Sequence, residues 1–472
     1  MEPDRWRAPA AQGPVRARPR VPGSKSITNR ALVLAALSSA PSKIKNPLKA
    51  RDTTLAATAL RVMGYGIDFS LTDLAVSPGS LSPGDSVSVD VGNAGTVMRF
   101  LPAVAALSPA SVSFDGDPRA RERPVGVLLS ALRSLGAAID DGGRGALPFT
   151  VHGSGAVRGG PVTLDASGSS QLVSGLLLAA PRFTDGVEVR HSGPPVPSLP
   201  HIEMTLRMLE MAGASVSASA SGAGAVSGAG GSGAGGPGFG GRPDTWRVRP
   251  GELRLGDFTV EPDLSNAGPF LAAALVTGGS VTIADWPRDS LQAADAILSV
   301  LTEMGASCSA GPDGLTVTGS GTVNGIEADL RDIPELCLPL TAVAALASGP
   351  SVFTGVGHTR AQETDRLAAI AKEINALGGD ITERPDGLAV RPRPLRAEPG
   401  HGFGSYDDHR MVMAAAVLGL AVPGIEVANA ATVGKTFPDF TAVWEEMVAG
   451  TSSSAEPASG AESASGLAEP GR

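Results

Sequence analysis

Six stretches of the chain are apolar on almost every face of a helix, and each follows directly on a short polar loop. A helix that is apolar all round is buried in a folded protein, and these stretches are too short and too rich in alanine to span a membrane. We therefore predict six buried helices whose N-termini lie at polar loops, where free N–H groups and the helix dipole favour anions. The six sequences are SKSITNRALVLAAL, NAGTVMRFLPAVAAL, SGSSQLVSGLLLAA, DLSNAGPFLAAALV, DIPELCLPLTAVAAL and DDHRMVMAAAVLGL.

A second repeat runs out of phase with the first. Five times a helix-like stretch ends in a glycine and is followed by a short β-type run. A glycine at this place commonly adopts the left-handed conformation that closes a helix. The spacings of 72, 77, 92 and 73 residues are longer than a solenoid repeat, so each unit should be a small α/β fold. The glycines are Gly64, Gly136, Gly213, Gly305 and Gly378.

Two segments have the composition of flexible linkers. Residues 217–241 are almost entirely Gly, Ala and Ser, and residues 449–472 add Glu and Pro to the same mixture. Neither segment can bury enough apolar surface to offset the entropy of ordering its backbone. We predict a disordered insert at about 217–241 and a disordered tail at 449–472.

Composition narrows the class of protein. The 472 residues are 42% hydrophobic and 18% charged, which is typical of a globular protein, and the net charge of −9 argues against nucleic acid or an anionic membrane as a partner. Cys308 and Cys337 are far apart and have no metal-ligand spacing, so we expect neither a disulfide framework nor a metal site. No signal peptide or membrane span is apparent, and we expect a cytoplasmic protein.

The polar loops carry the residues that could bind anions. Lys25, Ser26 and Arg30 combine small residues with charge, but the spacing of a Walker loop is missing, and a solvated helix cap is as good an interpretation. The stretch DPRARERP alternates three arginines with other residues, which would send some of them the same way; for Arg121 and Arg123 surface salt bridges are an equal alternative.

Further polar residues begin the later helices. Ser169, Ser170 and Gln171 offer two hydroxyls and an amide where one N-cap would suffice. Glu335 is explained equally well as a helix cap, and Glu363 with Arg366 as a local pair. Judged alone, His409 is as readily structural as catalytic, and both cysteines are expected in the core.

Taken together and in order, these motifs closely resemble the 5-enolpyruvylshikimate-3-phosphate (EPSP) synthase family, over residues 21–447. The motifs are PGSKSITNRALVLAAL, GNAGTVMRFL, DPRARERPVG, SGSSQLVSGLLLAAP, QETDRL, DDHRMVMA and GKTFPDF. The resemblance implies an α/β fold, a two-domain inside-out α/β barrel with six βαβαββ repeats, three per domain. One lobe would span residues 22–260, and the other, discontinuous lobe residues 1–21 plus 261–448.

The resemblance also implies a reaction. The enolpyruvyl group of phosphoenolpyruvate would pass to the 5-hydroxyl of shikimate 3-phosphate by addition and elimination through a tetrahedral intermediate, releasing phosphate, in aromatic amino acid biosynthesis. No cofactor or metal would be required, and we expect a monomer. Because both substrates are anionic and bind between the lobes, domain closure is expected when shikimate 3-phosphate binds.

The resemblance assigns roles by position. Glu363 would protonate the methylene carbon, Glu335 would accept the hydroxyl proton, and Lys25 and His409 complete the catalytic set. The residues implied to hold shikimate 3-phosphate are Lys25, Ser26, Arg30, Ser169, Ser170, Gln171, Ser198 and Glu335. Those implied to hold phosphoenolpyruvate are Lys25, Gly95, Arg119, Gln171, Arg366, Arg410 and Lys435.

Some positions depart from the family pattern. Gln362 stands where Lys is common, His358 where Asn is frequent and His201 where Tyr is common, so contacts to shikimate 3-phosphate there are in question. Two alternatives remain. The related UDP-N-acetylglucosamine enolpyruvyl transferases need a loop cysteine that DPRARERP lacks, and a catalytically inactive anion-binding relative would not need the retained carboxylates and lysines.

Overall fold

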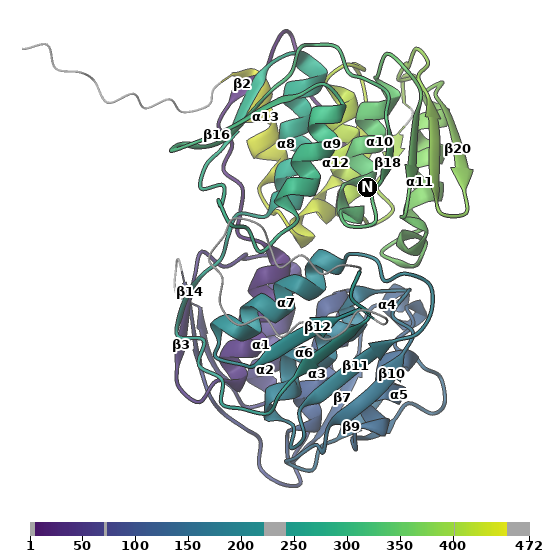
Figure 1. Ribbon diagram of the computed structural model, residues 1–472. Helices are drawn as coiled ribbons and strands as arrows, with labels where there is room; N and C mark the ends of the chain where they lie inside the picture. Colours follow the sequence, from purple (N-terminus) through teal and green to yellow (C-terminus); the bar gives the residue numbers. More distant parts are fainter. Residues whose placement is uncertain (1–4, 70–72, 221–241, 401, 451–472) are drawn as a thin grey trace, which may run out of the picture.

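The computed structural model describes residues 5–69, 73–220, 242–400 and 402–450, which form two lobes stacked one above the other (Figure 1). Each lobe has a hydrophobic core of its own. The core of the first lobe runs from Ile27 to Val260 and also includes Leu291. The core of the second lobe contains Ala8, Val15 and residues 264–447. Since Leu291 packs into the first lobe, the boundary at residue 260 stays a prediction.

In its described residues the first lobe contains three four-stranded sheets, each with one parallel and two antiparallel pairs of strands. In spatial order they are β14 (Asp257–Thr259), β3 (Ser42–Lys45), β5 (Asp73–Ser77) and β4 (Gly66–Phe69); β6 (Ser86–Asp90), β7 (Ser111–Asp115), β9 (Phe149–His152) and β8 (Ala138–Asp140); and β10 (Gly160–Leu164), β11 (Val187–His191), β13 (Thr245–Val248) and β12 (Val216–Ser219).

The second lobe contains two sheets of the same pattern and one of three strands, among the described residues. Two of these sheets are completed by strands near the N-terminus, β1 (Arg5–Arg7) and β2 (Arg16–Ala17), so residues 5–17 belong to the second lobe. In spatial order the sheets are β16 (Ser307–Gly311), β17 (Gly314–Thr318), β15 (Ser280–Ile283) and β2 (Arg16–Ala17); β18 (Glu327–Asp329), β19 (Ser351–Thr354), β21 (Gly387–Arg391) and β20 (Asp380–Arg384); and β1 (Arg5–Arg7), β23 (Glu426–Ala428) and β22 (Gly402–Gly404).

The six predicted buried helices are present and lie inside the lobes. Almost every residue of each is buried, as expected for helices that are apolar on all sides. They are α1 (Lys25–Leu37), α3 (Gly95–Ala106), α6 (Ser170–Ala179), α8 (Leu264–Thr277), α10 (Cys337–Ala345) and α12 (His409–Gly419).

The other helices alternate with these along the chain. Five of them end at the predicted glycines, all of which have φ between +90° and +105°, so this prediction is confirmed. The longer helices are α2 (Arg51–Val62), α5 (Gly126–Ser134), α7 (Leu199–Met211), α9 (Ala294–Glu303), α11 (Arg366–Ala376) and α13 (Phe440–Ala449). The short ones are α4 (Pro118–Glu122), η1 (Ala180–Arg182), η2 (Pro334–Leu336), η3 (Gly357–Ala361) and η4 (Ala430–Lys435).

Three expectations need correction. Disorder from residue 217 is contradicted, because Ser217–Ser219 belong to β12 and pair with β13, whose buried Trp246 anchors that edge. The rest of the predicted insert, residues 221–241, lies outside the described residues. Disorder from residue 449 is contradicted too, since α13 reaches Ala449 and Gly450 closes it. The rest of the predicted tail, residues 451–472, lies outside the described part.

The third correction concerns the arginine-rich stretch. Residues 118–122 form helix α4, so its arginines do not alternate as they would on a strand. In the overall fold, no closed barrel is found among the described sheets. No helix in the described part of the chain has the length and apolar character needed to cross a bilayer.

Candidate functional site

A cavity of about 340 Å³ opens between the two lobes, and both contribute to its walls. The first lobe supplies the beginnings of α1, α3 and α6, and the second lobe supplies the beginnings of α11 and α12 together with η2 and η3. The cavity brings together residues from all seven motifs. The predicted site residues that line it are Lys25, Ser26, Gly95, Ser169, Gln171, Glu335, Glu363, Arg366, His409 and Arg410.

Helix N-termini face this cavity. Ser169 caps α6 by accepting a hydrogen bond from Gln171 N (3.2 Å), and Asp408 caps α12 by accepting one from Arg410 N (2.8 Å). Asp263 caps α8 and also accepts from the backbone N–H of Lys25 (3.0 Å), which ties the start of α1 to α8 across the lobes. Converging helix starts give the cavity a positive potential without a basic protein surface.

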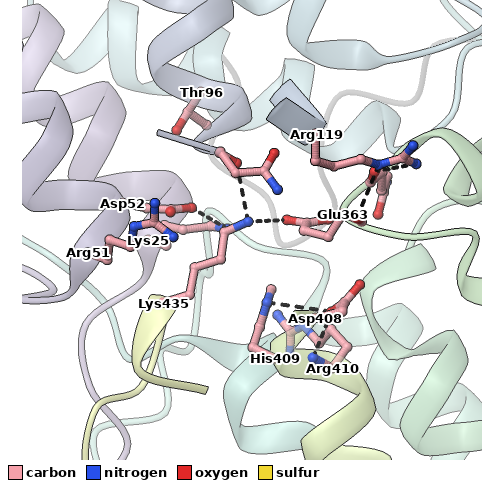
Figure 2. Close-up of polar contacts among 12 residues, drawn as sticks. Lys25, Arg51, Asp52, Thr96, Arg119, Glu363, Asp408, His409, Arg410 and Lys435 are labelled. Atoms are coloured by element: carbon pink, nitrogen blue, oxygen red, sulfur yellow. Dashed lines mark hydrogen bonds and ion pairs between the residues drawn. The ribbon is translucent and has the colours of Figure 1, made fainter. Parts of the chain in front are cut away.

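Lys25 presents its ammonium group beside a buried carboxylate. Its Nζ lies 3.4 Å from Oδ2 of Asp52, a residue in the first turn of α2 that is 2% exposed (Figure 2). Asp52 also lines the cavity. This carboxylate therefore restrains the lysine side chain at the cavity wall, and sequence reasoning did not single it out.

Glu363 is held by two cations. Its Oε1 lies 2.7 Å from Lys435 Nζ (Figure 2). Its Oε2 accepts from Arg366 (3.1 Å). Burial alone would raise the pKa of this carboxyl, but Lys435, Arg366 and Arg123 outweigh it and hold the pKa well below its ordinary value. Glu363 is therefore ionised in the unliganded protein.

The second carboxylate, Glu335, lies on η2 across the cavity. His201 of α7, in the first lobe, places Nδ1 3.5 Å from Oε1 of Glu335. Burial would raise the pKa of Glu335, but His201, its own backbone N–H and Arg410 lower it below the ordinary value. Glu335 is thus an ionised group able to accept a proton.

His409 is buried at the start of α12. Its Nδ1 lies 3.6 Å from Oδ1 of Asp408 and has no hydrogen-bond partner. Burial, with Arg410 and Lys25 nearby, lowers the pKa of His409 well below its ordinary value. The imidazole is therefore neutral and offers the cavity a donor or an acceptor.

Two arginines of the cavity were not predicted as ligands. Arg99 and Arg123 are 5% and 6% exposed, and the Nε atom of each lacks a partner. Burial and the neighbouring Arg123 lower the pKa of Arg99 to about 9. Gly95 lies between them, because a Cβ atom there would be 2.7 Å from Arg123 and 2.8 Å from Arg99. Two incompletely paired guanidinium groups beside a glycine provide space and charge for a small anion.

For Arg121 and Arg123 the sequence leaves a surface salt bridge as an equal alternative. Arg121 does pair with Asp115 (2.7 Å), but Arg123 follows the end of α4 and turns inward to Asn93 (2.9 and 3.0 Å). The available signal was Pro124, since a residue before proline leaves the helical conformation and so changes direction.

Arg119 and Lys435 lie on the far side of Glu363, lining a second hollow of about 990 Å³. Arg119 donates to the backbone oxygens of Gln362 and Glu363 (both 3.2 Å), and Lys435 donates to Asn93 O (3.3 Å). Each of these bonds joins one lobe to the other. These two cations therefore meet Glu363 but do not line the central cavity.

Three other predicted site residues, Arg30, Ser170 and Ser198, do not line the central cavity. Arg30 is 1% exposed, and its guanidinium donates to Thr205 Oγ1 (2.7 Å), Ser26 O (2.9 Å), His201 O (2.9 Å) and Ser174 Oγ (3.3 Å). Burial lowers the pKa of Arg30 to about 9.

The other two are serines. Ser170 is buried in the first turn of α6. Ser198, with φ +50°, donates its N–H to Arg331 O (2.8 Å) and so joins the lobes. Neither lines the cavity as described.

The cysteines take no part in the site. Cys337 is buried in α10, and burial raises the pKa of its thiol to about 12, so it belongs to the core as expected. In the residues that the structure describes, no group of three His, Cys, Asp or Glu side chains is arranged to hold a metal ion.

A family model described as EPSP synthase (3-phosphoshikimate 1-carboxyvinyltransferase) matches residues 9–234 and 239–444. The chain belongs to the EPSP synthase family. A 3-phosphoshikimate 1-carboxyvinyltransferase of Kocuria rhizophila (strain ATCC 9341 / DSM 348 / NBRC 103217 / DC2201) is 47% identical over 456 residues, covering 94% of this chain and 97% of the relative. The predicted EPSP synthase resemblance is thereby confirmed.

Solved structures agree at the level of fold. Two structures of EPSP synthase from Acinetobacter baumannii each match with a TM-score of 0.73, at 23% and 22% identity, and cover 94% of this chain and 98% of the other. The mixed α/β architecture is therefore that of EPSP synthases.

Proposed function

We propose that this chain transfers the enolpyruvyl group of phosphoenolpyruvate to the 5-hydroxyl of shikimate 3-phosphate, giving 5-enolpyruvylshikimate 3-phosphate and phosphate for chorismate and aromatic amino acid biosynthesis. As a member of the EPSP synthase family the chain is a transferase. One observation carries the residue assignment. Glu335 and Glu363 face one cavity together with Lys25, Arg366 and Arg410, so two proton-transferring groups adjoin several cations.

The resemblance to the family suggests the proton transfers, and the cavity supports them by bringing both carboxylates together. Glu335 takes the proton of the acceptor hydroxyl as its oxygen forms a bond to C2 of phosphoenolpyruvate, while Glu363 gives a proton to C3. The tetrahedral adduct then loses the C3 proton to a base, the double bond re-forms and phosphate leaves. Because Glu363 is ionised when unliganded, it must first gain a proton. Substrate anions that engage Lys435 and Arg366 would raise its pKa and permit this.

Cations and helix N-termini overcome the repulsion between the two anionic substrates. On the phosphoenolpyruvate side we place Lys25, Arg366, Arg410, Gly95 and Gln171, joined by Arg99 and Arg123. Arg119 and Lys435 would reach this substrate only by giving up their present contacts with the backbone of the opposite lobe or with Glu363.

On the acceptor side we place Ser26, Ser169 and Gln171, which line the cavity, together with Lys25 and Glu335. Ser170 and Ser198 would add hydroxyls after small shifts. Arg30 orients this wall through its bonds to Ser26 and His201, and direct contact with the acceptor would need those bonds to break.

The finer architecture is part of the same proposal. The recurring sheet pattern, with one parallel and two antiparallel pairs of strands, supports a two-domain inside-out barrel of six βαβαββ units. A cytoplasmic monomer with no nucleic acid, membrane or cofactor requirement fits this function.

The test is release of phosphate from the two substrates by the purified protein. Wild type should turn over, and Glu363→Gln and Lys25→Met should each lower kcat by about 10²- to 10⁴-fold. Glu303→Gln, on the exposed face of α9, is the matched control and should be fully active. Activity with UDP-N-acetylglucosamine as the acceptor contradicts the proposal. A lack of activity with both shikimate 3-phosphate and UDP-N-acetylglucosamine also contradicts it.

A further inference from the structure

The segment that leads from β22 into α12 has an unusual backbone. Tyr406 and Asp407 are consecutive and both have φ +54°. This left-handed conformation is strained for non-glycine residues and persists only where the surroundings impose it. Contacts with neighbouring elements must therefore hold the segment Gly404–Asp408 in this conformation.

Helix α11 holds this segment at two points on one face. Arg366, in its first turn, donates to both carboxylate oxygens of Asp408 (2.7 and 3.2 Å). Two turns later Glu373 accepts from Gly404 N (3.0 Å) and from the hydroxyl of Tyr406 (2.5 Å). Residues seven apart lie on the same side of a helix, so α11 clamps the segment at both ends.

The clamp at Glu373 is buried and depends on the tyrosine. Glu373 is 5% exposed, and a buried carboxylate is costly unless hydrogen bonds satisfy it. Burial and Glu373 raise the pKa of Tyr406, so its hydroxyl stays protonated and remains a donor. Lys372 lies over the tyrosine ring, 5.5 Å from its centroid, and Asn429 donates to Asp407 (2.6 Å).

Asp408, which follows Tyr406 and Asp407, positions two of the arginines that line the cavity. Asp408 is fully buried, caps α12 through Arg410 N and fixes Arg366, which also donates to Glu363. A shift of Asp408 would displace Arg366 and Arg410 together.

We propose that Glu373 and Tyr406 are positioning residues for the phosphoenolpyruvate side of the site. They hold the strained turn so that Asp408 presents Arg366 and Arg410 to the cavity. Neither residue lines the central cavity, so they act through Asp408. The proposal rests on the function proposed above.

The kinetic test removes one hydroxyl group. In Tyr406→Phe the KM for phosphoenolpyruvate should rise about tenfold, as loss of a bond worth roughly 1.4 kcal/mol predicts, while the KM for shikimate 3-phosphate stays within about twofold. Tyr65→Phe is the matched control, because Tyr65 is the other tyrosine of the chain and lies in the first lobe. It should leave both KM values unchanged.

A double-mutant cycle identifies the partner. Glu373→Leu should raise the same KM, and combining it with Tyr406→Phe should add little, because either change alone removes the hydrogen bond between the two side chains. Equal rises in both KM values, or a lower melting temperature with neither KM changed, would show a merely structural role and overturn the proposal.

A crystal structure of Tyr406→Phe gives a readout that does not depend on activity. We expect the backbone at residues 406 and 407 to relax and Asp408 to move out of hydrogen-bond distance of Arg366. An unchanged contact between Arg366 and Asp408 would refute the positioning role, whereas failure of wild type to release phosphate would refute the proposed function instead.

Discussion

Three histidines face the cavity at His201, His358 and His409, and burial lowers the pKa of each. Each unfolded histidine takes up a proton below pH about 6.5, before the folded protein does. The unfolded state therefore gains protons first, and the free energy of unfolding falls as the pH drops below about 6.5. Glu335 and Glu363 have lowered pKa values too, but their loss of stability begins only below about 4.5, so the histidines dominate between these limits.

Replacing the most buried of these histidines should reduce that pH dependence. Between pH 7.5 and 5.5, one neutral buried histidine costs about 1.4 kcal/mol of stability, so His409→Gln should lose that much less than wild type over this interval. Urea unfolding at both pH values measures the difference. His152→Gln, at an exposed site on β9, is the control and should keep the wild-type dependence. An equal fall in wild type and His409→Gln would show that His409 is protonated in the folded protein.

Among the elements, those governed by local pattern could be predicted from the sequence. The buried helices follow from all-round apolarity, and their capping glycines from the need for positive φ. Contacts between distant segments could not be predicted in this way. The pairing of β14 with β3, and the inward turn of Arg123 after α4, depend on tertiary packing that periodicity does not encode.

The same distinction between local pattern and tertiary contact applies to the residues of the candidate site. The family resemblance identified Lys25, Glu335 and Glu363, and all three line the cavity. It did not reveal that Lys435 would reach Glu363 from the opposite side, or that Arg30 would be enclosed by protein acceptors. Spacing along the chain shows which residues begin helices, but not which surface their side chains will meet.

The contact of α6 with α3 provides a test at the scale of elements. A Cβ atom on Gly175 would lie 2.2 Å from the carbonyl oxygen of Arg99, and backbone cannot move aside. Gly175→Ala gains about 1 kcal/mol of helix propensity but should lose more from overpacking, for a net loss of about 1 to 2 kcal/mol in the free energy of unfolding.

The contrasting variant is Gly95→Ala, at the start of α3. There the new methyl group meets only the ends of the Arg99 and Arg123 side chains and Gln171, which can shift. Its stability should stay within about 0.5 kcal/mol of wild type while the KM for phosphoenolpyruvate rises. Chemical denaturation and steady-state kinetics on both variants check this, and equal stability of the two proteins would contradict the packing argument.

The whole molecule consists of two hydrophobic cores joined by polar contacts. Among the described residues, bonds across the cleft include Arg119 to the backbone of Glu363, Lys435 to Asn93 O, and Arg207 to Asp289 (2.8 Å) and Ser290 O (2.6 Å). Such contacts are individually weak in water and are weakened further by salt. The lobes are therefore held together in part by interactions that a substrate can replace.

We predict that shikimate 3-phosphate draws the lobes together in solution. Its phosphate and hydroxyls would bridge Ser26 and Ser169 of the first lobe to Glu335 of the second. These charge-assisted bonds would add to the weak contacts between the lobes. The radius of gyration from X-ray scattering should fall on addition of the ligand, toward the roughly 23 Å of a compact chain of this length. Sodium sulfate at matched ionic strength is the control and should not reproduce the effect. If the radius of gyration is the same with and without shikimate 3-phosphate, the contacts between the lobes already hold them closed. Closure is then not part of the catalytic cycle.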